Sequence, residues 1–312
     1  MPLSAASALS ARNFLSPTFP VFFLFETSFD VYYAGMNSVV PESLGLIAGK
    51  GVYPLLLAES ARKQGVKRIF SIAFKGETEK AIEKYADEVI WINLGLLGAM
   101  LDALRDSHVK NVVMAGQITP THLFNIRMDA KMLSLLKKLP TKNAETIFGA
   151  VADELKALGM DLMPASMFME AHMPEAGLLS RRVPTETEQN DIEIGLKVAR
   201  TTSGLDIGQT VVIKGGTILA VEAFEGTDET IERAGKLGGP GAVIVKVAKR
   251  GHDMRFDIPV IGMHTLKTLR KIKASLLAVE AGRAILLERE KIIEEINNMD
   301  MCLVAVRYSE QQ

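Results

Sequence analysis

Short apolar runs alternate with longer segments in which apolar residues recur every three to four positions. Four of the runs lie between Leu44 and Ala115, and each is followed by a segment with helical spacing. Because short apolar runs are typical of buried strands, this alternation predicts a parallel sheet covered by helices on both faces. The predicted strands are 44–48, 66–73, 88–93 and 111–115, and the predicted helices are 54–61, 81–85, 96–104, 132–139 and 145–158.

The pattern changes beyond a proline-rich stretch at 164–184. Two apolar runs are joined there by Gly215-Gly216, and the freedom of glycine at positive φ suits a two-residue hairpin loop. The predicted strands are 210–214, 217–222, 242–247, 276–280, 284–287 and 302–306, with helices at 191–202 and near Asp228 and Thr265.

These patterns define an α/β fold class with an N-terminal doubly wound, Rossmann-like parallel sheet domain plus a second mixed α/β domain. We place the first domain at 44–168, a linker at 169–184 and the second domain at 185–307.

The first 43 residues differ from the rest in composition. They are rich in Ser, Phe and Pro, and Arg12 is their only basic residue. Their one strong apolar run, Val21–Phe25, is shorter than the apolar region of a signal peptide. An unstructured extension, or a start codon upstream of the native one at Met36, explains this segment better than a secretion signal.

Composition excludes several classes of protein. The 312 residues carry 36 Lys and Arg against 37 Asp and Glu, so there is no basic field to hold nucleic acid. A single cysteine allows no intrachain disulfide and fits a reducing, cytoplasmic compartment. The histidines lack the paired spacing of a zinc site, and no apolar stretch reaches the roughly 18 residues of a membrane span.

A glycine turn, Gly49-Lys50-Gly51, follows the first predicted strand and precedes the helix that Pro54 opens. Backbone N–H groups at such a helix start receive phosphates in many nucleotide-binding proteins. The dinucleotide fingerprint is incomplete, because Pro54 stands where its third glycine is expected and no acid follows the second strand. Gly49 and Gly51 are therefore either phosphate contacts or parts of a close-packed turn.

The fourth predicted strand ends at Gly116, and Gln117 and Thr119 follow it. Carboxyl ends of parallel strands meet at one edge of a sheet, where open α/β folds bind ligands. We therefore expect Gly116 to lie near the first glycine turn and Gln117 and Thr119 to contact a base or a sugar. An ordinary turn is the alternative.

Charged and apolar residues alternate around Asp253, Arg255 and Asp257. In an extended chain these three side chains share one face, about 6.5 Å apart. Mg²⁺ is usually held by one or two carboxylates together with phosphate oxygens, and Arg binds phosphate through paired N–H groups. The pattern suits phosphoryl transfer, and a self-neutralising ladder of surface charges is the alternative.

Acidic residues also surround a predicted helix start. Thr227 is expected to cap this helix, with Asp228 in its first turn. The functional alternative is that Glu222, Glu225 or Asp228 reaches the same metal ion or a sugar hydroxyl. Lys246, upstream of the charged face, either screens a phosphate or is simply solvated.

Five short segments in chain order are Leu44–Pro54, Ala115–Ile118, Leu205–Gln209, Ala220–Asp228 and Asp253–Pro259. Together they resemble the LpxI family of UDP-2,3-diacylglucosamine pyrophosphatases. Each segment is short, but five in order are specific, and the likeness extends from about Leu44 to Val306.

The resemblance implies hydrolysis of UDP-2,3-diacylglucosamine to 2,3-diacylglucosamine 1-phosphate (lipid X) and UMP, a step of lipid A synthesis. It implies that water attacks the α-phosphorus, that Mg²⁺ is required, and that the lipid lies between two domains of a protein that forms homodimers. A cytoplasmic enzyme with this substrate is expected to touch the inner-membrane surface transiently.

The resemblance and the residue patterns together assign roles to residues. The family's key aspartate corresponds to Asp257, which we expect to be catalytic together with Arg255 and Asp253. The expected metal ligands are Asp257, Asp253 and Glu222. The expected substrate-binding residues are Gly49, Gly51, Gly116, Gln117, Thr119, Glu225, Thr227 and Asp228.

Two features depart from the family. Nothing in it corresponds to the first 43 residues, and His252 stands where a glutamine is expected. Other nucleotide-sugar enzymes, a transferase or an oxidoreductase, remain alternatives, although the incomplete glycine fingerprint argues against a nicotinamide cofactor. A non-catalytic module that senses a nucleotide-lipid is a further alternative, and it would need no metal.

Overall fold

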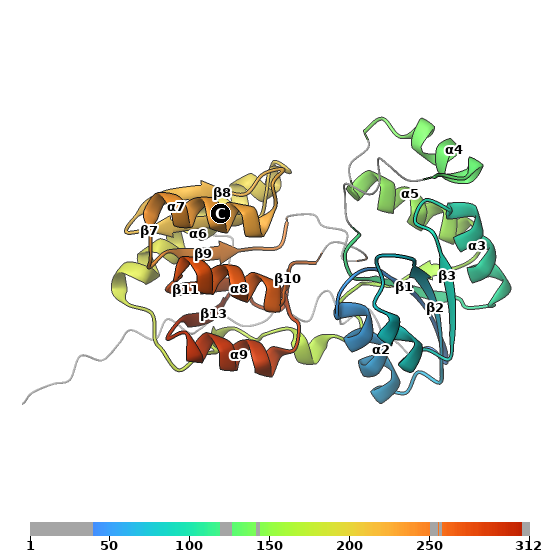
Figure 1. Ribbon diagram of the computed structural model, residues 1–312, viewed down its shortest axis with the longest axis horizontal. Coiled ribbons are helices and arrows are strands. Elements are labelled where there is room, and N and C mark those ends of the chain that lie inside the picture. Colours follow the sequence, from blue (N-terminus) through green and yellow to red (C-terminus); the bar gives the residue numbers. More distant parts are fainter. Residues whose placement is uncertain (1–39, 119–126, 142–143, 250–254, 256–257, 308–312) are drawn as a thin grey trace, which may run out of the picture. The chain divides into compact units, whose positions relative to one another are not determined.

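The computed structural model describes residues 40–118, 127–141, 144–249, 255 and 258–307 (Figure 1). All of them belong to one compact unit, 38–312. Four residues singled out above, Thr119, His252, Asp253 and Asp257, lie outside the described residues, as does the extension up to residue 39.

The first half alternates strands and helices as the apolar pattern predicts. Its elements are β1 (Ser43–Ala48), α2 (Tyr53–Lys63), β2 (Arg68–Phe74), the 3₁₀ helix η1 (Lys80–Lys84), β3 (Glu88–Ile92), α3 (Leu97–Asp106), β4 (Asn111–Ala115), α4 (Ala130–Lys138), α5 (Ala144–Ala157) and β5 (Asp161–Leu162).

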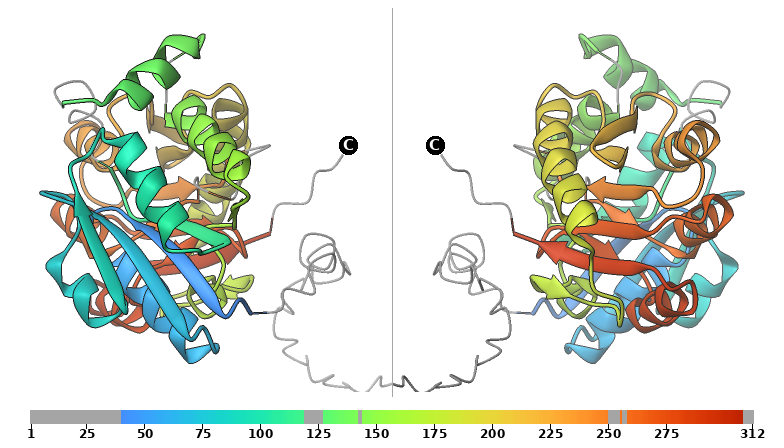
Figure 2. Two further views of the ribbon diagram at one scale, coloured as in Figure 1. Left: turned by 90° about the vertical axis from the view of Figure 1, so that its right-hand side faces the viewer. Right: turned by 90° about the vertical axis from the view of Figure 1, so that its left-hand side faces the viewer.

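The five strands form one parallel sheet in the order β3-β2-β1-β4-β5. On one face, Leu57 of α2 packs with Leu44 and Leu46 of β1. Helices α3 and α5 cover the other face (Figure 2). Leu104 of α3 and Leu155 of α5 belong to the buried cluster there. The doubly wound prediction is confirmed, and the strand order reverses between β1 and β4, where such folds place ligands.

The chain continues through η3 (Glu170–His172) into the second half. The elements of the second half are β6 (Gly177–Leu178), α6 (Glu186–Gly204), β7 (Thr210–Lys214), β8 (Thr217–Val221), α7 (Thr227–Gly238), β9 (Val243–Lys246), β10 (Val260–Ile261), α8 (Met263–Ile272), β11 (Leu276–Glu280), β12 (Ile285–Leu286), α9 (Arg289–Asn298) and β13 (Cys302–Val306). Strands β10 and β12 pair with each other, and the other strands form a larger sheet.

The larger sheet is mixed, with the order β6-β13-β11-β9-β7-β8. Its strands β9, β11 and β13 run parallel, and β7 and β8 add an antiparallel hairpin. Gly215 and Gly216 form the hairpin loop at φ 55° and 77°, and both donate N–H groups to Asp191. The second domain is therefore mixed α/β, as predicted.

Helices cover both faces of this sheet as well. Helix α6 lies on one face, where Gly195 packs so closely that an added Cβ would stand 2.5 Å from a methyl group of Val245. The other face carries Ile231 of α7, Leu269 of α8 and Ile292 of α9 in one buried cluster. Both halves are thus three-layered around a buried sheet.

Several element predictions need correction. The helix predicted at 191–202 begins at Glu186, because Thr185 and Glu188 form a capping box at its start. The segment expected as a short helix at 81–85 is a 3₁₀ helix. Helix α9 was not predicted, since its sequence is strongly polar and few of its residues are buried.

Two further findings concern the chain as a whole. Within the part of the chain that the structure describes, none of the helices combines the length and the apolar character needed to cross a bilayer. Cys302 is fully buried in β13, and burial raises the pKa of its thiol.

Candidate active site

The loops that follow β1 and β4 are bonded to each other. Gly49 N–H donates to Ala115 O (2.8 Å) and Lys50 N–H to Gln117 O (2.7 Å), while Gln117 N–H donates back to Lys50 O (3.2 Å). An added Cβ on Gly49 would stand 2.5 Å from Gln117 O, and one on Gly116 would stand 2.8 Å from Lys50 O. Glycine is therefore required at both positions for the backbones to approach.

This bridge limits what the glycine turn can bind. The N–H groups of Gly49 and Lys50 already have carbonyl partners, so they are not available to a phosphate. This geometry matches the close-packed turn, the second of the two interpretations of Gly49. Gly51, at φ 91° with nothing within 4 Å of its added Cβ, remains open, and Gln117 is exposed beside it.

The start of α2 closes this side of the site. Pro54 occupies the first turn of the helix, as predicted, and the hydroxyl of Tyr53 donates to Ala165 O beyond β5. Ser60 likewise donates to Phe168 O. These bonds join α2 to the chain that leaves the first sheet.

A polar network lies at the ends of β7, β8 and β9 in the second half. Glu222 is buried, and its carboxylate accepts from the backbone N–H of Gln209 (3.3 Å) and from the hydroxyl of Thr227 (2.9 Å). Lys246, the last residue of β9, is also buried and donates to Thr227 Oγ1 (3.1 Å) and towards Val260 O (3.5 Å). A carboxylate, a hydroxyl and an ammonium group are thus held together.

The cap of α7 differs from the prediction. Gly226, at φ 92°, is the N-cap, and Thr227 is the first helical residue. The hydroxyl of Thr227 is bonded elsewhere, because it donates to Glu222 and accepts from Lys246. The expected acids, Asp228 and Glu229, do lie in the first turn, where the helix dipole favours negative charge.

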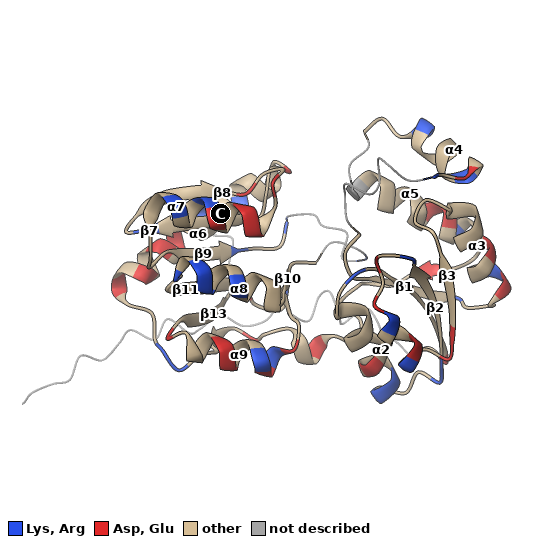
Figure 3. Cartoon of the chain, in the orientation of Figure 1, with Lys and Arg blue, Asp and Glu red and all other residues tan. Residues whose placement is uncertain are grey.

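Glu225 and Asp228 line the same pocket as Glu222, Thr227 and Lys246. Figure 3 shows acidic residues in red on α7. Hydrogen bonds from Arg233 (2.5 Å) and Thr230 (3.1 Å) hold Glu225, and the bond from Arg233 is the chief reason that its pKa is lowered. Asp228 Oδ2 lies 3.4 Å from His264 Nε2, whereas its buried Oδ1 has no hydrogen-bond partner among the described residues.

The segment predicted to carry the catalytic charges is anchored at both ends. Before it, Val247 N–H donates to Gln209 O (3.0 Å) and Ala248 N–H to Glu280 (2.9 Å), whose carboxylate is paired with Arg200. After it, Pro259 O accepts from Ile285 N–H (2.9 Å).

Within that segment the structure describes Arg255 alone, which is half-buried. Asp253 and Asp257 fall outside the described residues, so their roles as catalytic groups and metal ligands stay predictions. Ile258 and Pro259, which follow Asp257 directly, line the pocket described next.

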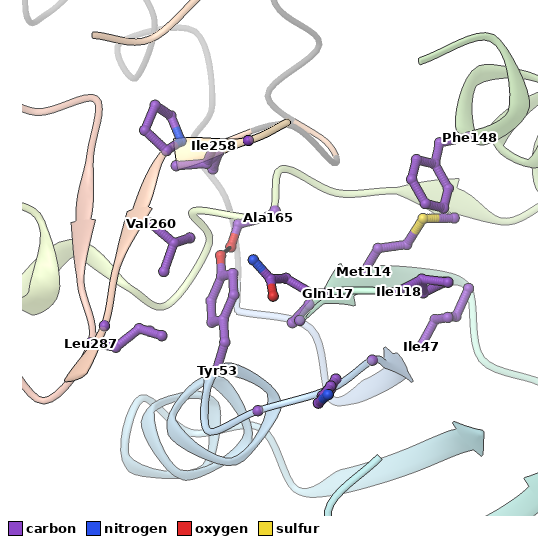
Figure 4. Close-up of a pocket in the computed structure, with 18 of the residues that line it drawn as sticks. Ile47, Tyr53, Met114, Gln117, Ile118, Phe148, Ala165, Ile258, Val260 and Leu287 are labelled. Atoms are coloured by element: carbon purple, nitrogen blue, oxygen red, sulfur yellow. Dashed lines mark hydrogen bonds between the residues drawn. The ribbon is translucent and has the colours of Figure 1, made fainter. Parts of the chain in front are cut away.

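These elements surround one pocket of about 940 Å³, lined by residues of both halves (Figure 4). It contains most of the described residues that the sequence singled out: Gly49, Gly51, Gly116, Gln117, Glu222, Glu225, Thr227 and Asp228.

The pocket also contains residues to which the sequence assigned no firm role. Gln209 and Tyr53 are pocket residues that the sequence analysis does not single out. Lys246 also lines the pocket, and the sequence allows it to be either a phosphate contact or a solvated lysine. The position of Lys246 at the carboxyl end of a parallel strand was the available signal, because ligands bind at that edge. Gln209 and Tyr53 lie in two of the segments that resemble the LpxI family, but no local pattern gave either of them a role.

The fold and the pocket define a class of protein. It is a two-part α/β protein whose ligand pocket lies at the carboxyl ends of parallel strands from two sheets, with charged groups concentrated on the second half. Such a pocket suits a small molecule that combines a polar part with an apolar part.

Comparison with known families makes the assignment specific. Residues 43–172 match the LpxI N-terminal domain, and residues 175–304 match the LpxI C-terminal domain. The chain belongs to the LpxI family.

A curated relative supports this membership. The UDP-2,3-diacylglucosamine pyrophosphatase LpxI of Caulobacter vibrioides is 29% identical over 279 residues, which span 84% of this chain and 97% of the relative.

Two solved structures are similar at a lower level. One is a Mycobacterium tuberculosis glycinamide-RNase-transformylase T, 13% identical with a TM-score of 0.23, over 58% of this chain and 44% of that one. The other is a Hydrogenobacter thermophilus 2-oxoglutarate carboxylase biotin carboxylase domain, 14% identical with a TM-score of 0.24, over 62% and 40%. At these scores neither carries an argument about this chain.

Proposed function

We propose that this protein hydrolyses the pyrophosphate bond of UDP-2,3-diacylglucosamine, releasing UMP and 2,3-diacylglucosamine 1-phosphate for lipid A synthesis. Membership of the LpxI family and the activity named for the Caulobacter relative support this reaction. The structural observation that carries it is the pocket, which has buried charged groups on one side and apolar side chains on the other. The substrate has the same division into a pyrophosphate and acyl chains.

In the proposed reaction the oxygen of water bonds to the α-phosphorus, and the bond from that phosphorus to the bridging oxygen breaks. The bridging oxygen leaves with the sugar phosphate, and the proton of water passes to a base on the enzyme. Asp257 is the proposed base or metal ligand, with Asp253 as the second carboxylate and Arg255 on a phosphate. Ile258 and Pro259, which follow this segment directly, line the pocket and support this proposal.

Lys246 is the proposed counter-charge for the pyrophosphate. Its ammonium group is buried at the end of β9 and held by Thr227. Positive charge that is fixed before the reaction stabilises the charge that develops on phosphoryl oxygens, and burial strengthens the effect.

Mg²⁺ is the proposed cofactor, and the oxygen atoms present fit it. Gln209 Oε1 and Asp228 Oδ1 are buried in the pocket wall without hydrogen-bond partners among the described residues. Those residues contain no group of three or more potential metal ligands, but Mg²⁺ usually needs only one or two carboxylates plus phosphate oxygens. Asp257, Asp253 and Glu222 are its proposed ligands, and the bound ion would neutralise charge on the phosphates.

Replacement of Asp257 tests the reaction most directly. Asp257→Asn removes the charge and keeps the shape, so UMP release should fall by about three orders of magnitude or more, the scale expected when a base or metal ligand is lost. Release of UMP from UDP-2,3-diacylglucosamine is measured with and without EDTA, beside the control Asp300→Asn at an exposed residue.

Three results bear on this assignment. Near-normal turnover of Asp257→Asn contradicts the role of that residue. Turnover that persists in EDTA contradicts the metal. A wild-type protein that binds the substrate but releases no UMP supports the sensing module instead.

Location and assembly are part of the same proposal. We expect a cytoplasmic homodimer that contacts the inner-membrane surface transiently to collect its lipid. Phe224, fully exposed in the loop between β8 and α7 beside the pocket, supports such a contact, because exposed aromatic side chains bind at membrane interfaces. Sedimentation velocity and flotation with phospholipid vesicles are the direct measurements.

A further inference from the structure

One region of the pocket is lined by side chains without a charged or strongly hydrogen-bonding group. They come from β4 and from α3, α4 and α5, all in the first half. In Figure 4, Met114 and Ile118 lie near each other, and Phe148 points from α5 toward Met114. We name six of these residues the apolar slot: Met100, Met114, Met132, Ile147, Phe148 and Val151.

The slot reaches the buried core of the first half. Met100, Met132 and Val151 line the pocket, yet they are only 5%, 7% and 6% exposed and belong to the cluster between the sheet and α3 and α5. An occupant of the slot therefore ends against packed side chains, and its length is limited by them.

The chemistry of the slot selects its occupant. A uracil ring or a ribose would need hydrogen-bond partners, and burying such groups without partners is unfavourable. The six side chains offer none. An acyl chain gains stability with each methylene that leaves water, and three methionines adapt to the shape of a flexible chain.

The polar groups around the slot also favour a substrate whose acyl chain lies in the slot. The β1–β4 bridge leaves no free N–H on Gly49 or Lys50 for a phosphate at the mouth of the slot. Glu222, Thr227 and Lys246 stand on the second half, where the pyrophosphate is proposed to bind. A substrate with its phosphates there can direct an acyl chain into the first half.

Resting on the proposed function, we propose that the apolar slot binds an acyl chain of the substrate and sets an upper limit on its length. The uridine lies outside the slot. Val151 is placed to set the limit, because it both lines the pocket and packs in the core.

The test is Val151→Phe, which fills part of the slot. The kcat/KM for substrate with long acyl chains should fall about tenfold or more, as expected when two or so methylenes lose their place. The value for an analogue with acetyl groups in place of the long chains should stay within about twofold. Inhibition by UMP should also stay within about twofold.

Leu155→Phe is the matched control. Leu155 lies one turn further along α5, in the same cluster, but does not line the pocket. This variant overpacks the same core and should change both substrates equally. If Val151→Phe does not fold, Phe148→Ala replaces it, since Phe148 is only half-buried; truncation should shift the preference toward longer chains.

The possible results distinguish a failure of the slot proposal from a failure of the proposed function. Equal losses for long-chain and acetyl substrates overturn the slot, and weakened UMP inhibition with unchanged chain preference places the nucleotide there instead. If wild-type protein hydrolyses neither substrate, the proposed function itself fails. A selective loss with long chains supports the slot.

Discussion

The two halves of this protein line one pocket with similar backbone elements but with different side chains. Each brings the carboxyl ends of parallel strands to the pocket. The first half contributes bridged glycine loops and apolar side chains, with Lys50 as its charged residue among those described. The second half contributes five carboxylates and a buried lysine: Glu222, Glu225, Asp228, Glu229, Glu288 and Lys246.

The difference shows that a doubly wound sheet does not by itself make a phosphate site. Its usual site lies where the strand order reverses, here between β1 and β4. In this protein the two loops at that point satisfy each other's N–H and C=O groups. Because the N–H groups of Gly49 and Lys50 are bonded in this way, we propose that the phosphates bind at the second sheet and that the first half holds apolar material.

Removing the buried lysine of the charged half should have the largest effect. Lys246→Met keeps most of the volume and deletes the charge, so kcat/KM should fall about 100- to 1,000-fold, the range seen when a preorganised electrostatic group is lost. UMP release is the measurement. The control is Lys214→Met, at an exposed lysine of β7. Turnover of Lys246→Met within threefold of wild type would show that the charged half does not act through this residue.

The glycine bridge of the first half can be broken by a single methyl group. Gly116→Ala combines φ 93° with a 2.8 Å approach to Lys50 O, and we expect a loss of about 3 kcal/mol in the free energy of unfolding. Gly76→Ala is the control, because Gly76 has φ 84° but nothing within 4 Å, so about 1 kcal/mol should be lost.

The single tryptophan makes this measurement specific to the first half. Trp91 lies in β3, so its fluorescence during urea unfolding reports on that sheet. Equal losses for the two glycine variants would mean that the backbone contact contributes nothing beyond the left-handed conformation.

Acid should lower the free energy of unfolding through the second half more than through the first. Of the effects predicted here, this is the smallest. Burial alone would raise the pKa of Glu188, but hydrogen bonds from Arg182 and from Thr185 N–H outweigh it and lower the pKa to about 2. In the first half, the effect of burial on Asp87 is likewise outweighed by hydrogen bonds from Ile69 N–H and Arg62, which lower its pKa, but the Asp87 side chain is 47% exposed.

The direction of the pH dependence of stability follows from the lowered pKa of Glu188. Glu188 stabilises the fold above its ordinary pKa of 4.5, and this contribution is lost as the pH falls from 4.5 towards about 2. We expect Glu188→Gln to remove about 1–2 kcal/mol at pH 7 and to flatten the acid dependence of the unfolding free energy, measured by circular dichroism. Asp87→Asn is the comparison and should change the curve less. A larger effect at Asp87 would reverse this ranking of the two halves.

Much of the fold could be predicted from local patterns. The run Leu44–Ala48 has no polar side chain, and all five of its residues are buried in β1. The start of α6 was missed although Thr185 and Glu188 carry a capping-box signature. Helix α9 was missed because charge dominates its sequence and only Ile292 and Ile296 are buried.

The site was predicted in part. Glu222, Glu225 and Asp228 lie close in the chain to a helix start, so a local pattern marked them. Lys246 is separated from Thr227 by 19 positions, and their hydrogen bond depends on how β9 pairs in the sheet. No local pattern carries that information.

The sequence by itself determined the α/β class, the parallel first sheet, the hairpin at Gly215-Gly216 and the resemblance to the LpxI family. These rest on periodicity and on residues adjacent in the chain. Only the tertiary structure decided that the glycine loops close on each other and that Lys246 is buried beside Glu222 and Thr227. It also placed an apolar slot in the first half, because side chains from separate elements form a pocket only once strand order and helix packing bring them together.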